Sequence, residues 1–185
     1  VDPTSAFGGI LGFNQLVTVD TAEEILKNFV EAVVAPGFDP EAIKLFSAKK
    51  NIRLMQMPGE ALNVKDQRFD LKKIGGGLLV QSQDSLNYVE DQLKIASERE
   101  PDAREMEDMK FAWLVAKHVK SNAIIYAKDK EILGIGAGQM SRVDSARVAV
   151  EKARKSLSGA VMASDAFFPF RDSVDEAAKN GISAI

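Results

Sequence analysis

The stretch that most constrains the fold covers residues 117–142, KHVKSNAIIYAKDKEILGIGAGQMSR, because several backbone signals follow one another in it. The end of a helix meets a polar Ser121–Asn122 corner, and an apolar run over 122–127 then predicts a strand. A charged turn at 128–130 leads to a second strand over 131–136, so the pattern is typical of a β-hairpin. A glycine-rich loop follows and brings Ser141 to the N-cap position of a helix over 141–157, with Asp144 placed as in a weak capping box.

The N-terminal part of the chain alternates between short apolar runs and helical patterns. Asp20 or Thr21 is expected to cap the first helix, and Asp39-Pro40 is a strong start signal for the second. The expected elements are a strand over 9–13, a helix to about 27–29, a strand over 30–35, a helix to about 49–50 and a strand over 52–57. This order predicts an α/β fold with a largely parallel sheet.

The rest of the chain also alternates, and a polar stretch over 58–68 is a plausible junction between two subdomains. Three glycines within the apolar run 69–81 predict a bulge or a close backbone approach rather than an ordinary strand. The longest helix is expected over 102–119, with an apolar face made by Met106, Met109, Trp113 and Ala116. Later elements are a strand over 160–163, a helix over 172–179 and a strand over 182–185. We therefore expect subdomains over 1–65 and 66–185, truncated at both ends.

Composition excludes several function classes. The chain has 185 residues, a net charge of −3, one histidine and no cysteine. No global basic field would recruit nucleic acid or an anionic membrane, and no apolar run is long enough to span a bilayer. Disulfides and a thiol nucleophile are excluded, and the lack of soft ligands argues against a zinc site. A cytoplasmic location is compatible with this composition.

The glycine-rich loop over 134–140 permits two interpretations. Flexible backbone at a helix N-terminus attracts anions, whereas the simpler interpretation is a tight turn from strand to helix. The loop is neither a dinucleotide fingerprint, because a hairpin strand precedes it, nor a P-loop, which would end in Gly-Lys-Ser/Thr. Arg142 at a helix start is unfavourable to the helix dipole, which favours a ligand-facing role for this side chain.

A second candidate is the aromatic loop over 164–173, where three phenylalanines surround Pro169. Such a loop could form the flat wall of a pocket for a planar ligand, with Asp172 as a hydrogen-bond acceptor. Alternatively, the loop plugs the core and Asp172 caps the next helix.

Three further features carry weaker signals. Residues 5–9 (SAFGG) offer backbone that a ligand could approach closely, or form only a turn. Glu31 interrupts an apolar strand, which fits either a functional carboxylate or a strand-end position. Lys117 and His118 could form an acid–base pair, but basic residues also suit the last turn of a helix, and we favour that interpretation.

Six motifs, in this order, give the chain a family resemblance: 5–9 (SAFGG), 34–37 (VAPG), 75–81 (GGGLLVQ), 120–124 (KSNAI), 134–142 (GIGAGQMSR) and 163–172 (ASDAFFPFRD). Together they resemble the AICAR transformylase part of bifunctional purine biosynthesis proteins, whose separate N-terminal domain carries IMP cyclohydrolase activity. The resemblance implies formyl transfer from 10-formyltetrahydrofolate to the exocyclic amine of the AICAR nucleotide. It also implies cytidine-deaminase-like α/β subdomains with mixed sheets, no metal requirement, and a homodimer with active sites at its interface.

The resemblance also implies residue roles. Asn122 would position the carboxamide region of the nucleotide beside the catalytic groups, so it is the one catalytic candidate. The nucleotide side would be formed by Phe7, Gly8, Glu31, Asn122 and Phe167. The folate side would be formed by Gln139, Ser141, Arg142, Pro169, Phe170 and Asp172, with Asp172 accepting from the pterin-like ring.

Two departures from the family pattern limit what this chain is expected to do alone. The family's catalytic Lys-His pair belongs to a different motif, expected upstream of Val1, and Lys117-His118 only imitates it. The family's C-terminal segment with its basic tail is expected beyond Ile185. We therefore expect no transformylase turnover from this chain alone. The alternatives are a non-catalytic dimerising or ligand-binding module and a zinc deaminase of similar fold, which the absence of cysteine disfavours.

Overall fold

The computed structural model describes residues 6–58 and 69–185, and the chain forms two compact units, an N-terminal unit over 2–85 and a C-terminal unit over 86–185. Helices and strands of both parallel and antiparallel sheets make the fold α/β, as expected from the sequence. The subdomain boundary expected at residue 65 lies outside the described residues and stays a prediction. No helix of the described ranges combines the length and apolarity needed to cross a bilayer.

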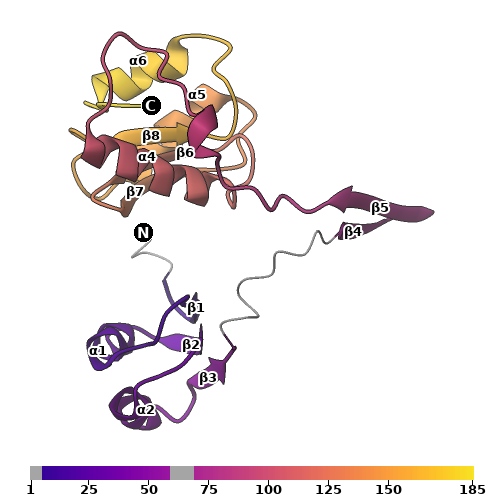
Figure 1. Ribbon diagram of the computed structural model, residues 1–185, viewed down its shortest axis with the longest axis vertical. Coiled ribbons are helices and arrows are strands. Elements are labelled where there is room, and N and C mark those ends of the chain that lie inside the picture. Colours follow the sequence, from indigo (N-terminus) through magenta and orange to yellow (C-terminus); the bar gives the residue numbers. More distant parts are fainter. Residues whose placement is uncertain (1–5, 59–68) are drawn as a thin grey trace. The chain divides into compact units, whose positions relative to one another are not determined.

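The N-terminal unit contains the expected parallel sheet, in the order β1-β2-β3 (Figure 1). Its elements are β1 (Gly9–Gly12), α1 (Val19–Leu26), β2 (Val30–Ala35), α2 (Pro40–Ser47) and β3 (Arg53–Gln56). Val33 of the central strand and Phe46 of α2 belong to one apolar cluster that joins the helices to the sheet. Burial of this continuous apolar surface is what holds the layers together.

The helix starts in this unit follow from local chemistry, with one correction. Asp39 precedes Pro40 at the start of α2, as expected. The cap of α1 was expected at Asp20 or Thr21, and this was wrong: Thr18 is the N-cap, and its hydroxyl accepts the N–H of Thr21. The earlier hydroxyl takes the position because Val19 already has helical geometry.

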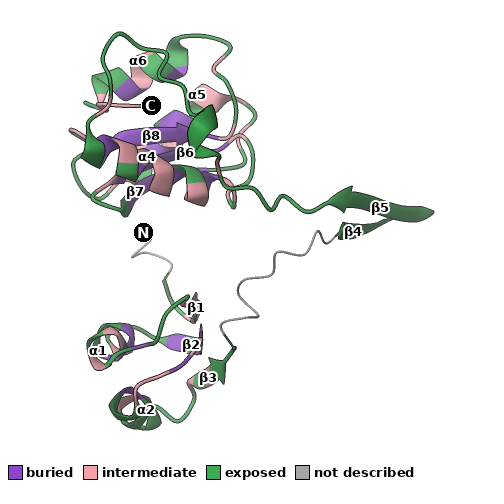
Figure 2. Cartoon of the chain, in the orientation of Figure 1, coloured by how far each residue is buried: buried purple, intermediate pink, exposed green. Residues whose placement is uncertain are grey.

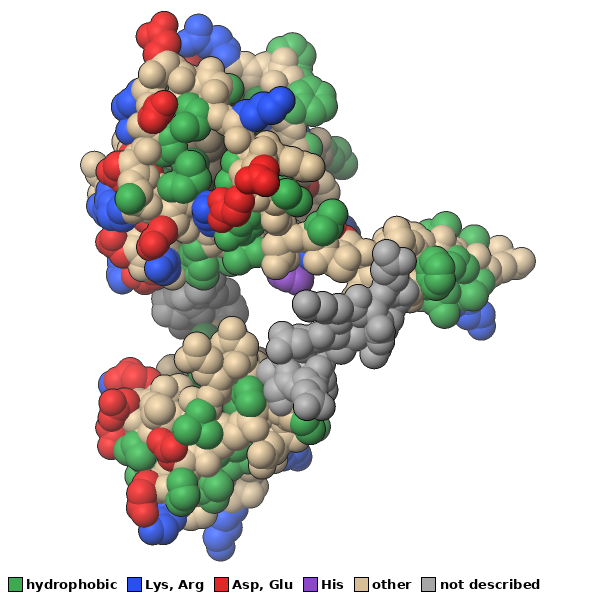
Figure 3. All heavy atoms as spheres, viewed as in Figure 1, with side chains coloured by type: hydrophobic (Ala, Val, Ile, Leu, Met, Phe, Trp, Pro, Cys, Tyr) green, Lys and Arg blue, Asp and Glu red, His purple; other side chains and the backbone are tan. Residues whose placement is uncertain are grey.

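Residues 69–82 form an antiparallel hairpin, so the bulge expected there was wrong. β4 (Phe69–Ile74) pairs with β5 (Gly77–Ser82), and Ile74 lies opposite Gly77. Gly75 and Gly76 are therefore the two-residue turn, and Gly76 has a φ of +83°, which glycine adopts without a Cβ penalty. All residues of both strands are exposed (Figure 2), and hydrophobic side chains gather over the hairpin (Figure 3).

The C-terminal unit is a sheet of order β7-β6-β8 with helices on both faces (Figure 1). Its elements are the short 3-10 helix η1 (Glu90–Gln92), α4 (Ala103–Ala116), β6 (Ile124–Lys128), β7 (Glu131–Gly136), α5 (Arg142–Lys152), β8 (Val161–Ser164) and α6 (Asp172–Lys179). Alternate residues of β6 serve the two faces: Ile124 and Tyr126 pack with α5 and α6, whereas Ile125 and Ala127 pack with α4.

Several expectations for this unit need correction. The first hairpin strand begins at Ile124 rather than Asn122, α5 ends at Lys152 rather than 157, and the strand over 182–185 is reduced to a bridge between Val161 and Ala184. Trp113 does not lie on the buried face of α4. Its side chain is 49% exposed, and its indole N–H donates to the carbonyl of Asn87 at 2.7 Å, which satisfies the polar atom outside the core.

Candidate functional site

The candidate site of the C-terminal unit begins where three loops are hydrogen-bonded together. The side-chain Nδ2 of Asn122 donates to the carbonyls of Gln139 and Met140, at 2.9 and 3.0 Å. The N–H of Gly138 donates to the carbonyl of Lys120 at 2.8 Å. Two of the motifs that carry the family resemblance, 120–124 and 134–142, therefore lie against each other.

Arg142 ties the third loop to the same place. Its Nε donates to Ser164 Oγ at 2.8 Å, and its Nη2 contacts Asp165 Oδ1 at 2.9 Å. The other carboxylate oxygen of Asp165 accepts from the hydroxyl of Ser121. The side chains of Arg142 and Asp165 are only 11% and 17% exposed, so water screens this pair less than a surface pair.

The charge state of Asp165 reflects these contacts. Burial raises the pKa of its carboxyl group, but the hydrogen bonds from Ser121 and Arg142 oppose this effect, and the net pKa is lowered. The carboxylate is therefore ionised at neutral pH and holds both partners. Two N–H donors of Arg142 are thus used within the protein, and its expected role on the folate side stays a prediction.

The glycines of the 134–140 loop serve packing as well as turning. A Cβ atom on Gly136 would lie 1.8 Å from the carbonyl oxygen of Ser145, and one on Gly134 would lie 2.2 Å from that of Ala149. Only glycine lets α5 approach β7 this closely. Gly138, with a φ of +68°, turns the chain before the helix.

Ser141 occupies the N-cap of α5, as the sequence predicts. Its hydroxyl accepts the N–H of Asp144 at 3.2 Å and lies 2.6 Å from the Asp144 carboxylate. A side-chain carboxylate thus already lies at the start of the helix, where an external anion would otherwise be attracted. The structure therefore favours the tight-turn interpretation of this loop.

The aromatic loop after β8 lies partly against the core and partly faces outward, so the planar-ligand wall stays a prediction and the helix cap expected at Asp172 was wrong. Phe168 packs against the core, whereas Phe167 and Phe170 are 78% and 72% exposed. Asp172 is the first residue of α6 rather than its N-cap, and its Oδ1 accepts the N–H of Ser173 at 2.7 Å. Pro169 is exposed between the two outward rings.

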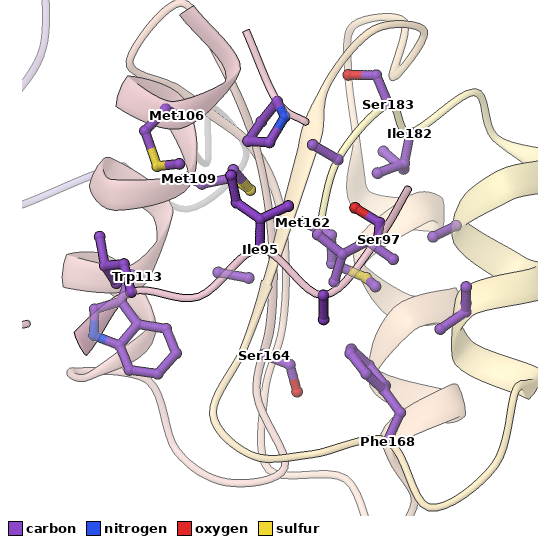
Figure 4. A pocket seen from close by; sticks show the side chains of 18 of the residues that line it. Ile95, Ser97, Met106, Met109, Trp113, Met162, Ser164, Phe168, Ile182 and Ser183 are labelled. Carbon is purple, nitrogen blue, oxygen red and sulfur yellow. The ribbon is translucent and has the colours of Figure 1, made fainter. Parts of the chain in front are cut away.

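A largely apolar cavity of about 840 Å³ adjoins this loop. Figure 4 shows Met106, Met109 and Trp113 of α4 on one side and Phe168 on the other, with Ile95 between them. Three hydroxyl groups also line it, those of Ser97, Ser164 and Ser183. The volume is within the range of small-molecule sites. The segment over 88–101 supplies part of the wall, and no periodic pattern in that segment had indicated a cavity.

Glu105 anchors this wall. Arg99 contacts the Glu105 carboxylate through two N–H groups, at 2.8 and 3.1 Å, and also donates to the carbonyl of Ser183. Glu105 in turn forms a capping box with Asp102. The hydrogen bond from Arg99, followed by those from Ser183 and the Asp102 N–H, lowers the pKa of Glu105 to about 2.

Three predicted residues of the N-terminal unit form a group of their own. The rings of Phe7 and Phe29 have centroids 4.7 Å apart. Gly8 has a φ of +72°, and a Cβ atom on it would lie 3.3 Å from Glu31 Oε1. Glu31 is exposed near the start of β2, so it is not a buried charge. Ser5 of the same motif lies outside the described residues.

Lys117 and His118 lie at the end of α4, as the preferred interpretation predicts. Lys117 is the C-cap, and its Nζ contacts the carbonyl of Leu86 at 3.1 Å and Oδ1 of Asn87 at 3.3 Å. His118 is exposed. Over residues 6–58 and 69–185, no group of three or more potential metal-ligating side chains could hold a metal ion.

Comparison with known proteins agrees with the resemblance. The family model described as AICARFT/IMPCHase bienzyme matches residues 1–152. Two curated relatives named "Bifunctional purine biosynthesis protein PurH" are similar to the chain, from Magnetococcus marinus (51% identity, 100% of this chain, 36% of the relative) and Polynucleobacter asymbioticus (53% identity, 98% of this chain, 35% of the relative). The chain thus spans about a third of the length of these relatives. With most of its residues matched by the family model, the chain belongs to the AICARFT/IMPCHase bienzyme family.

Proposed function

We propose that this chain forms part of an AICAR transformylase site, which transfers a formyl group from 10-formyltetrahydrofolate to the exocyclic amine of AICAR in purine biosynthesis. The observation that carries the proposal is the pair of hydrogen-bonded contacts in which Asp165 holds Ser121 and Arg142 while the neighbouring Asn122 side chain holds the backbone of residues 139–140. It joins three of the motifs that carry the family resemblance. The family description and the names of the relatives support a role in purine biosynthesis, and the formyl transfer is what the family resemblance implies.

Asn122 positions the nucleophile. The exocyclic amine of AICAR is a poor nucleophile because its lone pair is delocalised into the ring and the carboxamide. Both N–H donors of the Asn122 amide are directed at loop carbonyls, so its Oδ1 is the atom suited to accept from the substrate. An acceptor fixed in this way would orient the amine towards the formyl carbon, which is the positioning that such a reaction needs.

The folate side is formed by the loops that Arg142 holds together. Two of its five N–H donors make the bonds to Ser164 and Asp165, and the proposal assigns the others to folate. Gln139 and Ser141 lie on the loop just before it. Phe170 and Pro169 offer an exposed surface for a planar ring, and the Asp172 carboxylate is the acceptor for its N–H groups.

The residues that the family resemblance assigns to nucleotide contacts are described in each unit by itself. Phe167 presents an exposed ring in the C-terminal unit, whereas Phe7, Gly8 and Glu31 form the group in the N-terminal unit. The proposal takes the homodimer as the active assembly, as the family resemblance implies.

Proton transfer is the function that this chain does not supply. His118 is the chain's single histidine, and it lies at the exposed end of α4 beside a lysine that binds the 86–87 segment. We therefore expect the 185-residue chain to bind ligands of the reaction without measurable formyl transfer. Turnover by the purified chain would show that Lys117-His118 acts as the acid–base pair.

Ligand binding tests the proposal directly. The melting temperature of the purified chain is measured with AICAR and, separately, with an antifolate; stabilisation by either supports a retained half-site. Asn122→Asp should remove the AICAR effect, because a carboxylate would face two carbonyl oxygens. Asn180→Asp is the matched control, since Asn180 also donates its amide within the C-terminal unit, to the carbonyl of Glu176. If neither ligand stabilises the unmodified chain, the chain is a non-catalytic module and the proposal fails.

A further inference from the structure

The hairpin β4–β5 has two unlike faces. Residues that lie opposite each other in an antiparallel pair share a face. One face therefore carries Lys73, Ser82 and four large apolar side chains that are well exposed: Phe69 (68%), Leu71 (60%), Leu78 (55%) and Val80 (52%). The other face carries Asp70, Lys72, Ile74, Leu79 and Gln81. This apolar face and both outer strand edges are exposed among the described residues.

A hairpin of this kind is marginally stable by itself. Two strands without a helix or further strands bury too little apolar surface to offset the entropy of ordering them. Open strand edges also present unpaired N–H and C=O groups to any matching strand. The hairpin is therefore the part of this chain most suited to acquire additional strands from another molecule.

We propose that β4 pairs antiparallel with β4 of a second copy of this chain, about a two-fold axis at Leu71. In a two-residue hairpin the pair that flanks the turn, here Ile74 and Gly77, is the hydrogen-bonded type. The alternate residues Phe69, Leu71 and Lys73 therefore direct their N–H and C=O groups to the free edge. A two-fold axis at Leu71 lets these groups bond to their counterparts and keeps both apolar faces on one side of the new sheet.

Charge complementarity selects this register. With the axis at Leu71, Asp70 lies opposite Lys72 of the second copy, and the pair occurs twice. These residues form non-hydrogen-bonded pairs, in which the Cα atoms are only about 4.5 Å apart and the side chains meet closely. An axis at Lys73 would instead place two lysines opposite each other, which is destabilising. Leu71 would meet its own counterpart, and Phe69 would lie beside the aliphatic stem of Lys73.

The other edge of the hairpin provides the competing arrangement. β5 carries no charged residue over 77–82, so pairing through β5 would have no electrostatic selection of register. The lysines of β4 could also act only to keep its edge unpaired, as edge lysines often do. Both alternatives give different outcomes from the β4 pairing.

This inference rests on the homodimer of the proposed function and deepens it by naming the strand through which two copies meet; self-association is measured without substrate, so its failure differs from a failure of the ligand-binding test. Sedimentation equilibrium of the full 185-residue chain compares the unmodified protein with Asp70→Lys, Lys72→Asp and an equimolar mixture of the two. Each single variant places like charges opposite each other twice and should weaken self-association by about tenfold. In the mixture, a chain with lysine at both positions meets a chain with aspartate at both positions. Opposite charges then face each other again, so mixed dimers should form with the affinity of the unmodified protein.

The mixture separates pairing between copies from any effect within one chain, because an effect within one chain would persist on mixing. Val80→Pro removes an edge N–H from β5 and should leave association unchanged. A monomeric unmodified chain, single variants that associate normally, or a mixture that stays monomeric would each overturn the proposal. Loss of association in Val80→Pro alone would assign the contact to β5 instead.

Discussion

The two β-hairpins of this chain have similar connections and opposite environments. β4–β5 and β6–β7 are both antiparallel with two-residue turns, flanked by Ile74–Gly77 and Lys128–Glu131. Most of β6 is fully buried, with helices on both faces, whereas every residue of β4 and β5 is exposed. Both carry several large apolar side chains. Apolar sequence alone therefore does not decide burial; the helices available to cover each face do.

The two turns are also built differently. Gly75 and Gly76 turn the exposed hairpin without a Cβ atom. Asp129 and Lys130 turn the buried hairpin with φ values of 52° and 56°, which cost energy for residues with side chains. Their N–H groups are accepted by the buried carboxylate of Asp108 on α4, at 2.9 and 2.8 Å. The buried hairpin thus depends on a long-range polar contact that the exposed hairpin does not need.

The largest expected effect on stability comes from adding a Cβ atom to a glycine in the tightly packed hairpin rather than in the exposed one. Gly136→Ala in β7 would place a Cβ atom 1.8 Å from the Ser145 carbonyl, whereas Gly77→Ala in β5 meets only the Ile74 side chain at 4.0 Å. We expect Gly136→Ala to destabilise the C-terminal unit by about 4 kcal/mol or more, because backbone atoms must move. Trp113 is the single tryptophan, so urea unfolding followed by its fluorescence reports on that unit. Equal midpoints for the two variants would show that α5 adjusts freely.

The next effect tests the carboxylate that supports the buried turn. Asp108→Ala leaves two N–H groups without their acceptor, and we expect a loss of about 2–4 kcal/mol by the same fluorescence measurement. Glu107→Ala is the matched control. Glu107 lies beside Asp108 on α4 and pairs with Lys130 at 2.9 Å, but both side chains are more than half exposed, so its loss should be below about 0.5 kcal/mol. Similar losses for the two variants would mean that the turn needs no buried acceptor.

Local signals in the sequence were sufficient where a helix or strand is defined by its own residues. β2 and α6 have the predicted bounds, and Ser141 is the predicted N-cap. The residues that begin or end these elements lie close to them in the sequence. A Pro-Gly break follows β2, and the hydroxyl that caps α5 lies three residues from its partner. The parallel sheet was predictable for the same reason.

The predictions that were wrong or missing share a different cause. On α4 an apolar inward face was expected, yet Glu105 and Asp108 are buried and Trp113 is half exposed. The two carboxylates are buried because Arg99 and the Asp129 turn satisfy them, and neither partner lies at a helical spacing from them. Periodicity within a helix cannot reveal pairs with residues outside it. The same limit applies to the site, where the loops were located by motif but the Arg142–Asp165 pair and the cavity wall were not.

A third, smaller effect is expected in how the free energy of unfolding depends on pH. The pKa of Glu105 is lowered from 4.5 to about 2 in the folded chain, chiefly by Arg99. Since the folded pKa lies below the unfolded one, this stabilisation is present above about pH 4.5 and is lost as pH falls towards 2. After allowance for solvent around the exposed Arg99, its size is on the order of 1 kcal/mol. Glu105→Gln should flatten the acid limb of Trp113-monitored stability. An unchanged acid limb would assign the pH dependence to other carboxylates.

The smallest expected effect on stability comes from exchanging glycine and lysine between the turns of the two hairpins. Lys130→Gly gives the buried turn a residue that adopts a φ of 56° without strain, while the N–H that Asp108 accepts is kept. Relief of strain outweighs the greater entropy of glycine in the unfolded chain and the loss of the exposed Glu107 pair, so we expect a gain of about 0.5 kcal/mol. The reverse change in the exposed hairpin, Gly76→Lys, should leave Trp113-monitored unfolding unchanged, because that turn belongs to the N-terminal unit and Trp113 to the C-terminal one. A loss of stability in Lys130→Gly would contradict this expectation. It would mean that the hydrogen bonds to Asp108 already offset the strain of the turn in full, and that the lysine side chain stabilises the hairpin beyond its ion pair.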